Sequence, residues 1–225
     1  KSESVQKPVN GQLDLFANFT TEDSRTQNFA NFETLKTTSH DYKLVDNEED
    51  MRSLCDFFMT KQILSLDTET TSTNPIEAEL VGLSFAVEES KAFYVPMPEN
   101  REEAQRVVEI FRPVYEEETI LKVGQNIKYD LEVLANYGVE LKGRMFDTMI
   151  AHYLIQPELR HNMDYMAEVY LNYQTIHIDE LIGPKGKNQR SMRSLPPNDV
   201  YEYACEDADI TLRLKNVLEP KLKEA

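Results

Sequence analysis

Residues 63–97 read ILSLDTETTSTNPIEAELVGLSFAVEESKAFYVPM and contain three runs that are strand candidates, at residues 63–68, 80–87 and 92–97. Each run has the length of a β-strand. Only short segments join the runs, and antiparallel strands can be joined in this way, whereas parallel strands need longer crossovers. This stretch therefore predicts an antiparallel meander.

Segments with helical periodicity surround the meander. Asn47 can cap a helix that runs to about residue 60. Its apolar face would consist of Met51, Leu54, Phe57 and Phe58. Further helices are predicted at about residues 101–111, 128–137, 147–156, 162–172 and 198–218, with Gly138 and Pro220 as terminators. With two short strands at residues 42–45 and 120–123, this order predicts an α/β fold in which a mixed sheet is covered by helices.

The composition limits what the chain can be. With 225 residues, of which 40% are apolar, it can bury one sizeable core. Its longest uncharged apolar run, residues 80–87, is far shorter than the ~20 residues of a membrane span. Two cysteines, Cys55 and Cys205, make no disulfide framework and favour a reduced, cytoplasmic protein. We therefore expect a folded domain at residues 41–225 and no membrane association.

Residues 1–40 differ from the rest of the chain. They are rich in Ser, Thr, Asn and Gln and have no sustained helical or alternating period. Such a composition is typical of a segment that cannot bury enough apolar surface to fold. It predicts a flexible N-terminal tail or linker.

Carboxylates occur at three places far apart in the sequence. Asp67 and Glu69 are two residues apart on a predicted strand and therefore leave the same face. Asp130 lies in the first turn of a predicted helix, and Tyr203 and Asp207 are one helical turn apart. Each place alone has an ordinary explanation: a strand end in water, an acid that complements a helix dipole, and a core tyrosine above an exposed acid. Together they supply the groups that can hold two divalent metal ions over a phosphodiester.

The motifs around these acids resemble the 3′→5′ exonuclease domain of bacterial DNA polymerase I, within the tyrosine subclass of the DnaQ-like exonucleases. The matching text is DTET (67–70), LVGLSFA (80–86), GQNIKYD (124–130), FDTM (146–149), RH (160–161), MD (163–164), GKNQ (186–189) and YACEDAD (203–209). The resemblance covers about residues 41–222. It implies a ribonuclease H-like fold.

The resemblance also implies a role for each acid. Asp67, Glu69 and Asp207 would hold one metal ion, and Asp67 would share a second ion that Asp130 supports through water. Tyr203 would orient the attacking water in its protonated form, since the ordinary pKa of a tyrosine is about 10. An all-oxygen site favours Mg²⁺ or Mn²⁺ over a thiolate-seeking metal.

Substrate contacts follow from the same resemblance. Asn126, Tyr129 and Arg160 match positions near the terminal nucleotides, and each could instead be a cap, a packed ring or a surface charge. Thr73 stands where relatives commonly have an apolar wedge, and Ile178 where some have an aromatic side chain. We therefore expect weaker stacking on the terminal bases.

The net charge of −16 has the wrong sign for a protein that binds nucleic acid, because affinity comes mainly from Lys and Arg on phosphates. Glu206 and Asp209, which point elsewhere on the last helix, are interpreted as part of an acidic solvated face. Bound metal ions, or basic surface on another part of a longer chain, would reconcile the charge with the function. One loop, residues 184–195, contains basic residues and no acid, namely Lys185, Lys187, Arg190 and Arg193. It is either a phosphate contact or a solvated loop.

These observations predict a metal-dependent exonuclease that removes nucleoside monophosphates from single-stranded DNA 3′ ends. It would proofread for a polymerase domain on a missing C-terminal part of the chain. One alternative is a ribonuclease D-like enzyme that trims RNA by the same chemistry, although GKNQ (186–189) favours the polymerase relative. The other is an inactive scaffold or interaction domain of a polymerase, although all four acids are present.

The tail contains one apolar island, Gln12-Leu13-Asp14-Leu15-Phe16. It resembles the short peptide with which bacterial replication proteins dock on the ring-shaped sliding clamp. Leu15 and Phe16 would enter an apolar pocket while Gln12 fixes the register. The alternatives are a chance island in a linker and a segment that packs back on the domain.

Overall fold

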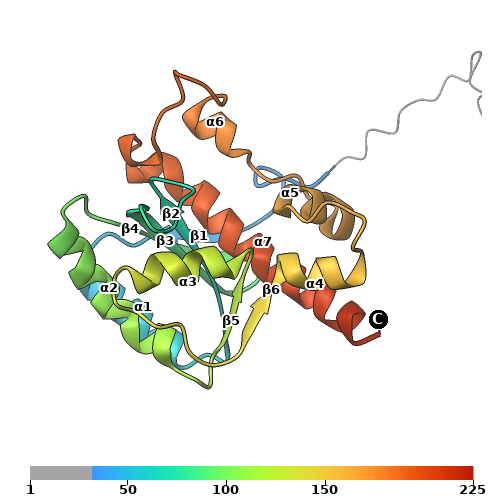
Figure 1. Ribbon diagram of the computed structural model, residues 1–225, viewed down its shortest axis with the longest axis horizontal. Helices are drawn as coiled ribbons and strands as arrows, with labels where there is room; N and C mark the ends of the chain where they lie inside the picture. The colour runs from blue at the N-terminus through green and yellow to red at the C-terminus, as the bar shows by residue number, and fades with distance from the viewer. Residues whose placement is uncertain (1–31, 225) are drawn as a thin grey trace, which may run out of the picture. The chain divides into compact units, whose positions relative to one another are not determined.

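The computed structural model describes residues 32–224, and the meander lies at the centre of its sheet (Figure 1). Strands β2 (Ile63–Thr70), β3 (Leu80–Glu88) and β4 (Lys91–Pro96) pair antiparallel in sequence order. The predicted meander is confirmed. β1 (Asp41–Leu44) adds in parallel to the outer edge of β4.

Two further strands complete a six-stranded mixed sheet of order β1-β4-β3-β2-β5-β6. β5 (Leu121–Gly124) pairs in parallel with β2, and β6 (Met145–Asp147) pairs in parallel with β5. β5 contacts only residues 63–65 of β2. In the described part of the chain, the second half of β2 therefore has no strand beside it on that side, and this half carries Asp67 and Glu69.

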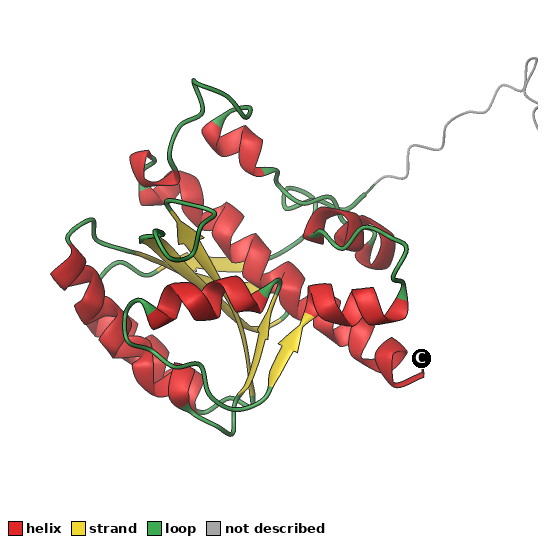
Figure 2. Cartoon of the chain, in the orientation of Figure 1, coloured by secondary structure: helices red, strands yellow, loops and turns green. Residues whose placement is uncertain are grey.

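Helices cover both faces of the sheet, as the chain's order of elements predicted (Figure 2). The side chains of Leu66, Phe85 and Val95 share a core with α1 (Glu48–Met59), α2 (Arg101–Glu116) and α3 (Ile127–Ala135). Ala92 and Tyr94 pack instead against α7 (Pro197–Glu224). This division follows from the alternation of side chains along each strand.

A third group of helices lies against the C-terminal half of α7 (Figure 1). It consists of α4 (Thr148–Ile155), α5 (Met163–Met166) and a π-helical turn (Ala167–Leu171). Their shared core includes Ala151, Met166 and Leu214. The structure thus confirms helices near the predicted segments 147–156 and 162–172.

Several local predictions differ from the structure. Strand β6 and the short helix α6 (Ile178–Ile182) were not predicted from the sequence. Phe57 is 39% exposed, and Cys55 is buried in the core instead. Pro220 does not end α7, which continues to Glu224. Proline removes one backbone hydrogen bond, and at this exposed position water can satisfy the carbonyl that loses its partner.

The residues just before β1 belong to the folded part, although their composition assigned them to the tail. Glu33 forms a β-bridge with Tyr173, and its backbone N–H donates to the carbonyl of Asn172 at 2.9 Å. Leu35 is buried. A single bridge of backbone groups leaves no periodic pattern in the sequence, which is why composition did not reveal it. The Gln12–Phe16 peptide lies outside the described residues.

Within residues 32–224, no helix has the length and hydropathy that a membrane crossing requires.

Candidate metal centre and substrate cleft

Strand β2 carries two acids on the face that α7 covers. Asp67 and Glu69 share this face with Ser65, whose hydroxyl donates to the carbonyl of Ala208 at 2.8 Å. This bond ties β2 to α7 beside Asp207. One carboxylate oxygen from each of Asp67, Glu69 and Asp207 lies within 4.8 Å of the other two. Acids separated by 140 residues thus form one cluster, which we call the acidic group.

Asp130 approaches the acidic group from α3. This helix begins where β5 ends, and β2 continues past that level. The hydroxyl of Thr68 donates to Oδ1 of Asp130 at 2.7 Å, and the Asp130 side chain is buried. Asp130 is not a member of the acidic group itself, but it lies close by. The charge of Asp130 raises the pKa of Glu69, and the charge of Asp67 raises the pKa of Asp130.

The four carboxylates resist ionisation together. Burial raises the pKa of Asp67 to about 6. Burial, and after it the charges of neighbouring acids, raises the pKa of each of the other three well above the ordinary range, namely Glu69, Asp130 and Asp207. No Lys, Arg or His of residues 32–224 forms an ion pair with any of the four. A bound cation would therefore favour the ionised form of these carboxyls, which nothing else in the described residues stabilises by an ion pair.

The chemistry of the acidic group fits a hard divalent cation. Its three donors are all carboxylate oxygens, and such donors suit Mg²⁺, Mn²⁺ and Ca²⁺. Cys205 is two residues from Asp207 but is not part of the group, and burial raises the pKa of its thiol. A thiolate-seeking metal finds no matching donor set here.

Tyr203 lies one turn before Asp207 on α7. Burial raises the pKa of its phenol far above that of free tyrosine, and the charges of Asp207, Glu69 and Asp67 add to the effect. The phenol is therefore protonated at neutral pH. It can donate a hydrogen bond beside the acidic group but cannot serve as a base.

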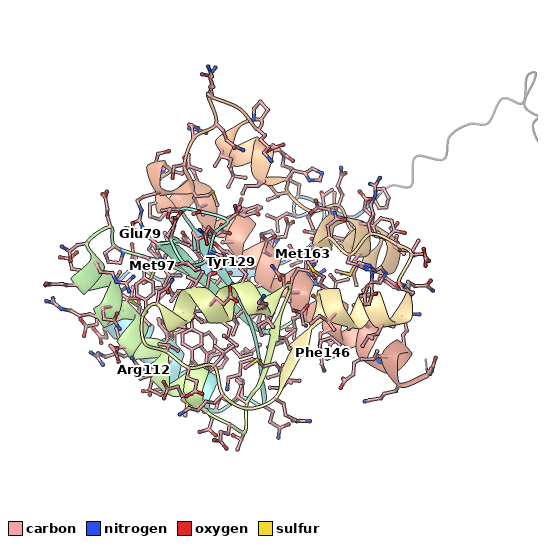
Figure 3. All side chains as sticks on the ribbon, viewed as in Figure 1. Glu79, Met97, Arg112, Tyr129, Phe146 and Met163 are labelled. Atoms are coloured by element: carbon pink, nitrogen blue, oxygen red, sulfur yellow. The ribbon has the colours of Figure 1, made fainter. Side chains whose placement is uncertain are left out.

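A cleft of about 600 Å³ opens beside Glu69. Four of the predicted substrate-binding residues line it, namely Thr73, Asn126, Tyr129 and Ile178. Tyr129, labelled in Figure 3, reaches from α3 to the β2–β3 loop, where its hydroxyl donates to the carbonyl of Ser72. The remaining lining comes mainly from β2 and from residues 189–192. The cleft lining thus combines one acid, Glu69, with apolar and amide groups.

Arg160 does not line this cleft. Its side chain is exposed, in the connection between α4 and α5. The carbonyl of the next residue, His161, accepts a hydrogen bond from Nε2 of Gln125 at 2.8 Å, which ties this connection to the residue before Asn126. A substrate contact by Arg160 stays a prediction.

The basic loop at residues 184–195 uses some of its charge for its own structure. Arg193 donates to the carbonyl of Leu80 at 2.9 Å and thereby holds the loop on the sheet. Arg190 donates to a backbone carbonyl of α6 at 2.5 Å. Lys185 and Lys187 are exposed. The four cations are therefore not equivalent: both arginines donate to backbone carbonyls, although Arg190 stays exposed, and the two lysines are exposed.

Glu206 and Asp209 are buried, so their assignment to a solvated face is wrong. Glu206 accepts hydrogen bonds from the Tyr173 hydroxyl at 2.7 Å and from a backbone N–H at 2.6 Å. Asp209 pairs with Arg213 at 2.6 Å and accepts from the Tyr42 hydroxyl at 2.8 Å. Both acids hold neighbouring segments on α7 and lie outside the acidic group.

Ser65 and Thr68 support the acids but were missed from the sequence. Both are buried polar side chains on the strand that carries Asp67. Buried hydroxyls nearly always have a hydrogen-bond partner, and two of them in an apolar strand are a usable signal. The partners themselves, Ala208 and Asp130, are visible only in the folded chain.

A family model described as 3′-5′ exonuclease matches residues 42–223. DNA polymerase I of Pseudomonas aeruginosa is 39% identical over 171 residues, which cover 72% of this chain and 19% of the relative. The chain thus spans about a fifth of the length of the curated relatives that it matches.

Solved structures agree on the fold. Escherichia coli RNase D, an exoribonuclease, matches with a TM-score of 0.64 and 18% identity, covering 82% of this chain and 46% of that one. Brucella melitensis NrnC, in a structure with bound Mg²⁺, matches with a TM-score of 0.60 and 21% identity, covering 83% of each chain. These neighbours confirm the predicted ribonuclease H-like fold.

Proposed function

Because the chain belongs to the 3′→5′ exonuclease family whose curated relatives are bacterial DNA polymerases I, we propose that it hydrolyses the terminal phosphodiester at DNA 3′ ends. In the whole protein it would proofread for a polymerase domain. The observation that carries the proposal is the acidic group of Asp67, Glu69 and Asp207, with Asp130 beside it, next to a cleft that Glu69 lines.

The acids would hold the metal ions of this reaction. Asp67, Glu69 and Asp207 supply the first set of donors, and Asp67 with Asp130 supplies a second. When bound, a pair of divalent cations such as Mg²⁺ stabilises both the attacking and the leaving oxygens of an in-line displacement. Three carboxylates within 4.8 Å of one another, with Asp130 beside them and no cationic side chain of the described residues paired to any of them, have no comparable use in a purely structural strand end.

Tyr203 would orient the water that attacks. Its protonated phenol donates a hydrogen bond to the water oxygen, which then faces the phosphorus of the terminal phosphodiester. As the water oxygen bonds to phosphorus and releases a proton to solvent, the bond from phosphorus to the 3′ oxygen of the preceding nucleotide breaks, and that oxygen takes up a proton from solvent. The products are a nucleoside monophosphate and a strand shortened by one nucleotide.

The cleft suits a single strand. Its volume of about 600 Å³ is in the range of pockets that enclose one drug-sized group, which a terminal nucleotide resembles and a duplex end exceeds. Tyr129 and Ile178 offer apolar surface for a base, and Asn126 offers an amide. Thr73 offers less apolar surface than a wedge residue would, so stacking there is weak.

The exposed lysines supply the charge that the acidic chain otherwise lacks. Lys185 and Lys187 are exposed on the loop whose residues 189–192 line the cleft. We assign them to backbone phosphates of the entering strand, with Arg160 as a further contact. Such contacts hold the strand without reading its sequence.

RNA is the second candidate substrate. The structural match to RNase D favours it, but at 18% identity that match concerns the fold alone, whereas the 39% identity to a DNA polymerase I extends to the sequence. Degradation of a labelled DNA strand and of a labelled RNA strand of the same sequence, each with Mg²⁺, separates the two candidate substrates. We expect faster release of nucleoside monophosphates from DNA, and faster release from mismatched than from paired 3′ ends. Equal rates on paired and mismatched ends would argue against proofreading.

A further inference from the structure

We propose that Asp147 is a positioning residue of the cleft, which acts by holding the start of α3 with the same carboxylate that caps α4. The proposal rests on the proposed function, because it assigns a role in binding the DNA strand. Asp147 is the last residue of β6, and Gly124, the last residue of β5, lies opposite it in the parallel register. Parallel strands that end together bring the following turns into contact.

The carboxylate of Asp147 accepts hydrogen bonds from two helices. As the N-cap of α4, its Oδ1 accepts from the N–H of Met149 at 2.9 Å and of Ile150 at 3.1 Å. Across the sheet it also accepts from the N–H of Asn126 at 3.3 Å and, through Oδ2, from that of Ile127 at 2.9 Å. Free N–H groups at a helix start favour an anionic acceptor, and here one anion serves two starts.

The start of α3 depends on this bridge because it has no cap of its own. Asn126 occupies the N-cap position but makes no side-chain cap bond, and its backbone is left-handed, with φ of 60° and ψ of 45°. That conformation is uncommon for a residue other than glycine and must be held by its surroundings. Thr148 adds to the hold, since its hydroxyl contacts the side chain of Gln125.

The held segment carries the cleft. Asn126 and Tyr129 line it, and Asp130 lies in the first turn of α3 beside the acidic group. A change in the direction of α3 would therefore move the amide, the ring and the carboxylate together. Loss of the Asp147 bridge would weaken DNA binding even where the fold survives.

The test separates the two functions of the carboxylate. In Asp147→Ser, the short hydroxyl can still cap its own helix α4 but cannot reach the start of α3. Asn100→Ala is the matched control, because Asn100 caps α2 through two similar bonds, at 2.9 and 3.1 Å, and does not line the cleft. Asp147→Asn keeps the shape and one acceptor oxygen, and it remains informative if the serine variant fails to fold.

We expect Asp147→Ser to weaken the binding of a short single-stranded DNA in Ca²⁺, and to raise KM, by about 10-fold or more, as is typical for residues that orient a site. Asp147→Asn should have DNA affinity and KM between those of the wild type and of Asp147→Ser. Asn100→Ala should leave DNA affinity and KM unchanged while lowering Tm. Amide hydrogen exchange should speed up at Asn126 and Ile127 in the serine variant, with Met149 and Ile150 still protected.

Unchanged binding and KM in Asp147→Ser, or the same loss in Asn100→Ala, would overturn the positioning role and leave Asp147 as an ordinary cap. Unchanged exchange at Asn126 and Ile127 would overturn the bridge itself. A wild-type protein that neither binds nor degrades single-stranded DNA would instead refute the proposed function. The exchange measurement does not depend on activity and still decides the bridge in that case.

Discussion

The hydroxyl of Thr68 donates a 2.7 Å hydrogen bond to Oδ1 of Asp130 and thereby joins the edge of β2 to the first turn of α3. Asp67 and Glu69, on either side of Thr68, leave the other face of the strand towards α7. One strand therefore supplies two acids directly and fixes a third through a threonine. The alternation of β2 determines the relative position of all three.

This bond can be removed without changing shape. In Thr68→Val, Asp130 loses the hydrogen bond of a buried group, which costs about 1–3 kcal/mol. We expect kcat to fall by roughly 10-fold, as for other groups that orient a metal ligand, while the fold persists. Thr68→Ser keeps the hydroxyl and should keep most of the activity. An equal loss in both variants would show that the methyl group matters and not the bond.

The metal-free protein should become less stable as pH rises, the reverse of ordinary acid denaturation. Burial raises the pKa of Asp67 to about 6, whereas an unfolded aspartate titrates near 3.9, so the folded state binds the extra proton between these values. Stability is therefore lost as pH rises from about 4 through 6, by up to about 3 kcal/mol for Asp67 alone. The raised pKa values of Glu69, Asp130 and Asp207 extend the loss to higher pH.

Thermal unfolding in a chelator at pH 5 and pH 8 measures this effect. We expect a lower Tm at pH 8, recovery on adding Mg²⁺, and a smaller pH dependence in Asp67→Asn, in which one titrating carboxyl is absent. A Tm that rises between pH 5 and pH 8 without metal would show that the acids are not crowded as described.

The two exposed lysines of the basic loop should affect binding and not chemistry. In Lys185→Gln with Lys187→Gln, KM for single-stranded DNA should rise and the slope of log affinity against log salt should fall by about 1 to 2, since each phosphate contact contributes about one. Lys221→Gln with Lys223→Gln, at the far end of α7, changes the charge equally. Identical effects of the two double variants would show that only the net charge matters and that the loop lysines make no specific phosphate contact.

Tyr203→Phe should retain measurable activity. The variant loses one hydrogen bond, worth roughly 0.5–1.5 kcal/mol, which corresponds to about 2- to 12-fold in kcat. Because burial and the nearby acids keep the phenol protonated, the pH profile between 6 and 9 should keep its shape. A lost limb of the pH profile would identify Tyr203 as a base and contradict the positioning role.

Local pattern accounts for the parts of the structure that depend on neighbours in sequence. Strand length and short connections predicted the meander, and the spacing of Tyr203 and Asp207 placed them on one side of α7. Asn47 was correctly predicted to cap α1, where its side chain accepts from the N–H of Asp50. The proximity of β2, α3 and α7 came from a family resemblance, because spacing alone relates no two of these segments.

Features that depend on distant partners were not predictable in the same way. Glu206 and Asp209 look like surface acids until Tyr173 and Tyr42, far away in sequence, donate hydrogen bonds to them. Asp147 lies at the start of a predicted helix, and only the parallel register of β5 and β6 brings a second helix start to it. Arg193 looks like a free cation until the carbonyl of Leu80 binds it. In each case a long-range contact decides the role of a charge.

The most direct test of the central claim is the degradation of 5′-labelled single-stranded DNA by the wild-type chain and by Asp67→Ala, with Mg²⁺ and with a chelator. We expect the wild type to shorten the strand one nucleotide at a time from the 3′ end, only with metal. Asp67→Ala should be folded and should show no detectable activity, because the acidic group loses a donor that both sets of metal ligands share. Wild-type rates in Asp67→Ala, or degradation by the wild type in the chelator, would contradict a metal-dependent exonuclease site built on these acids.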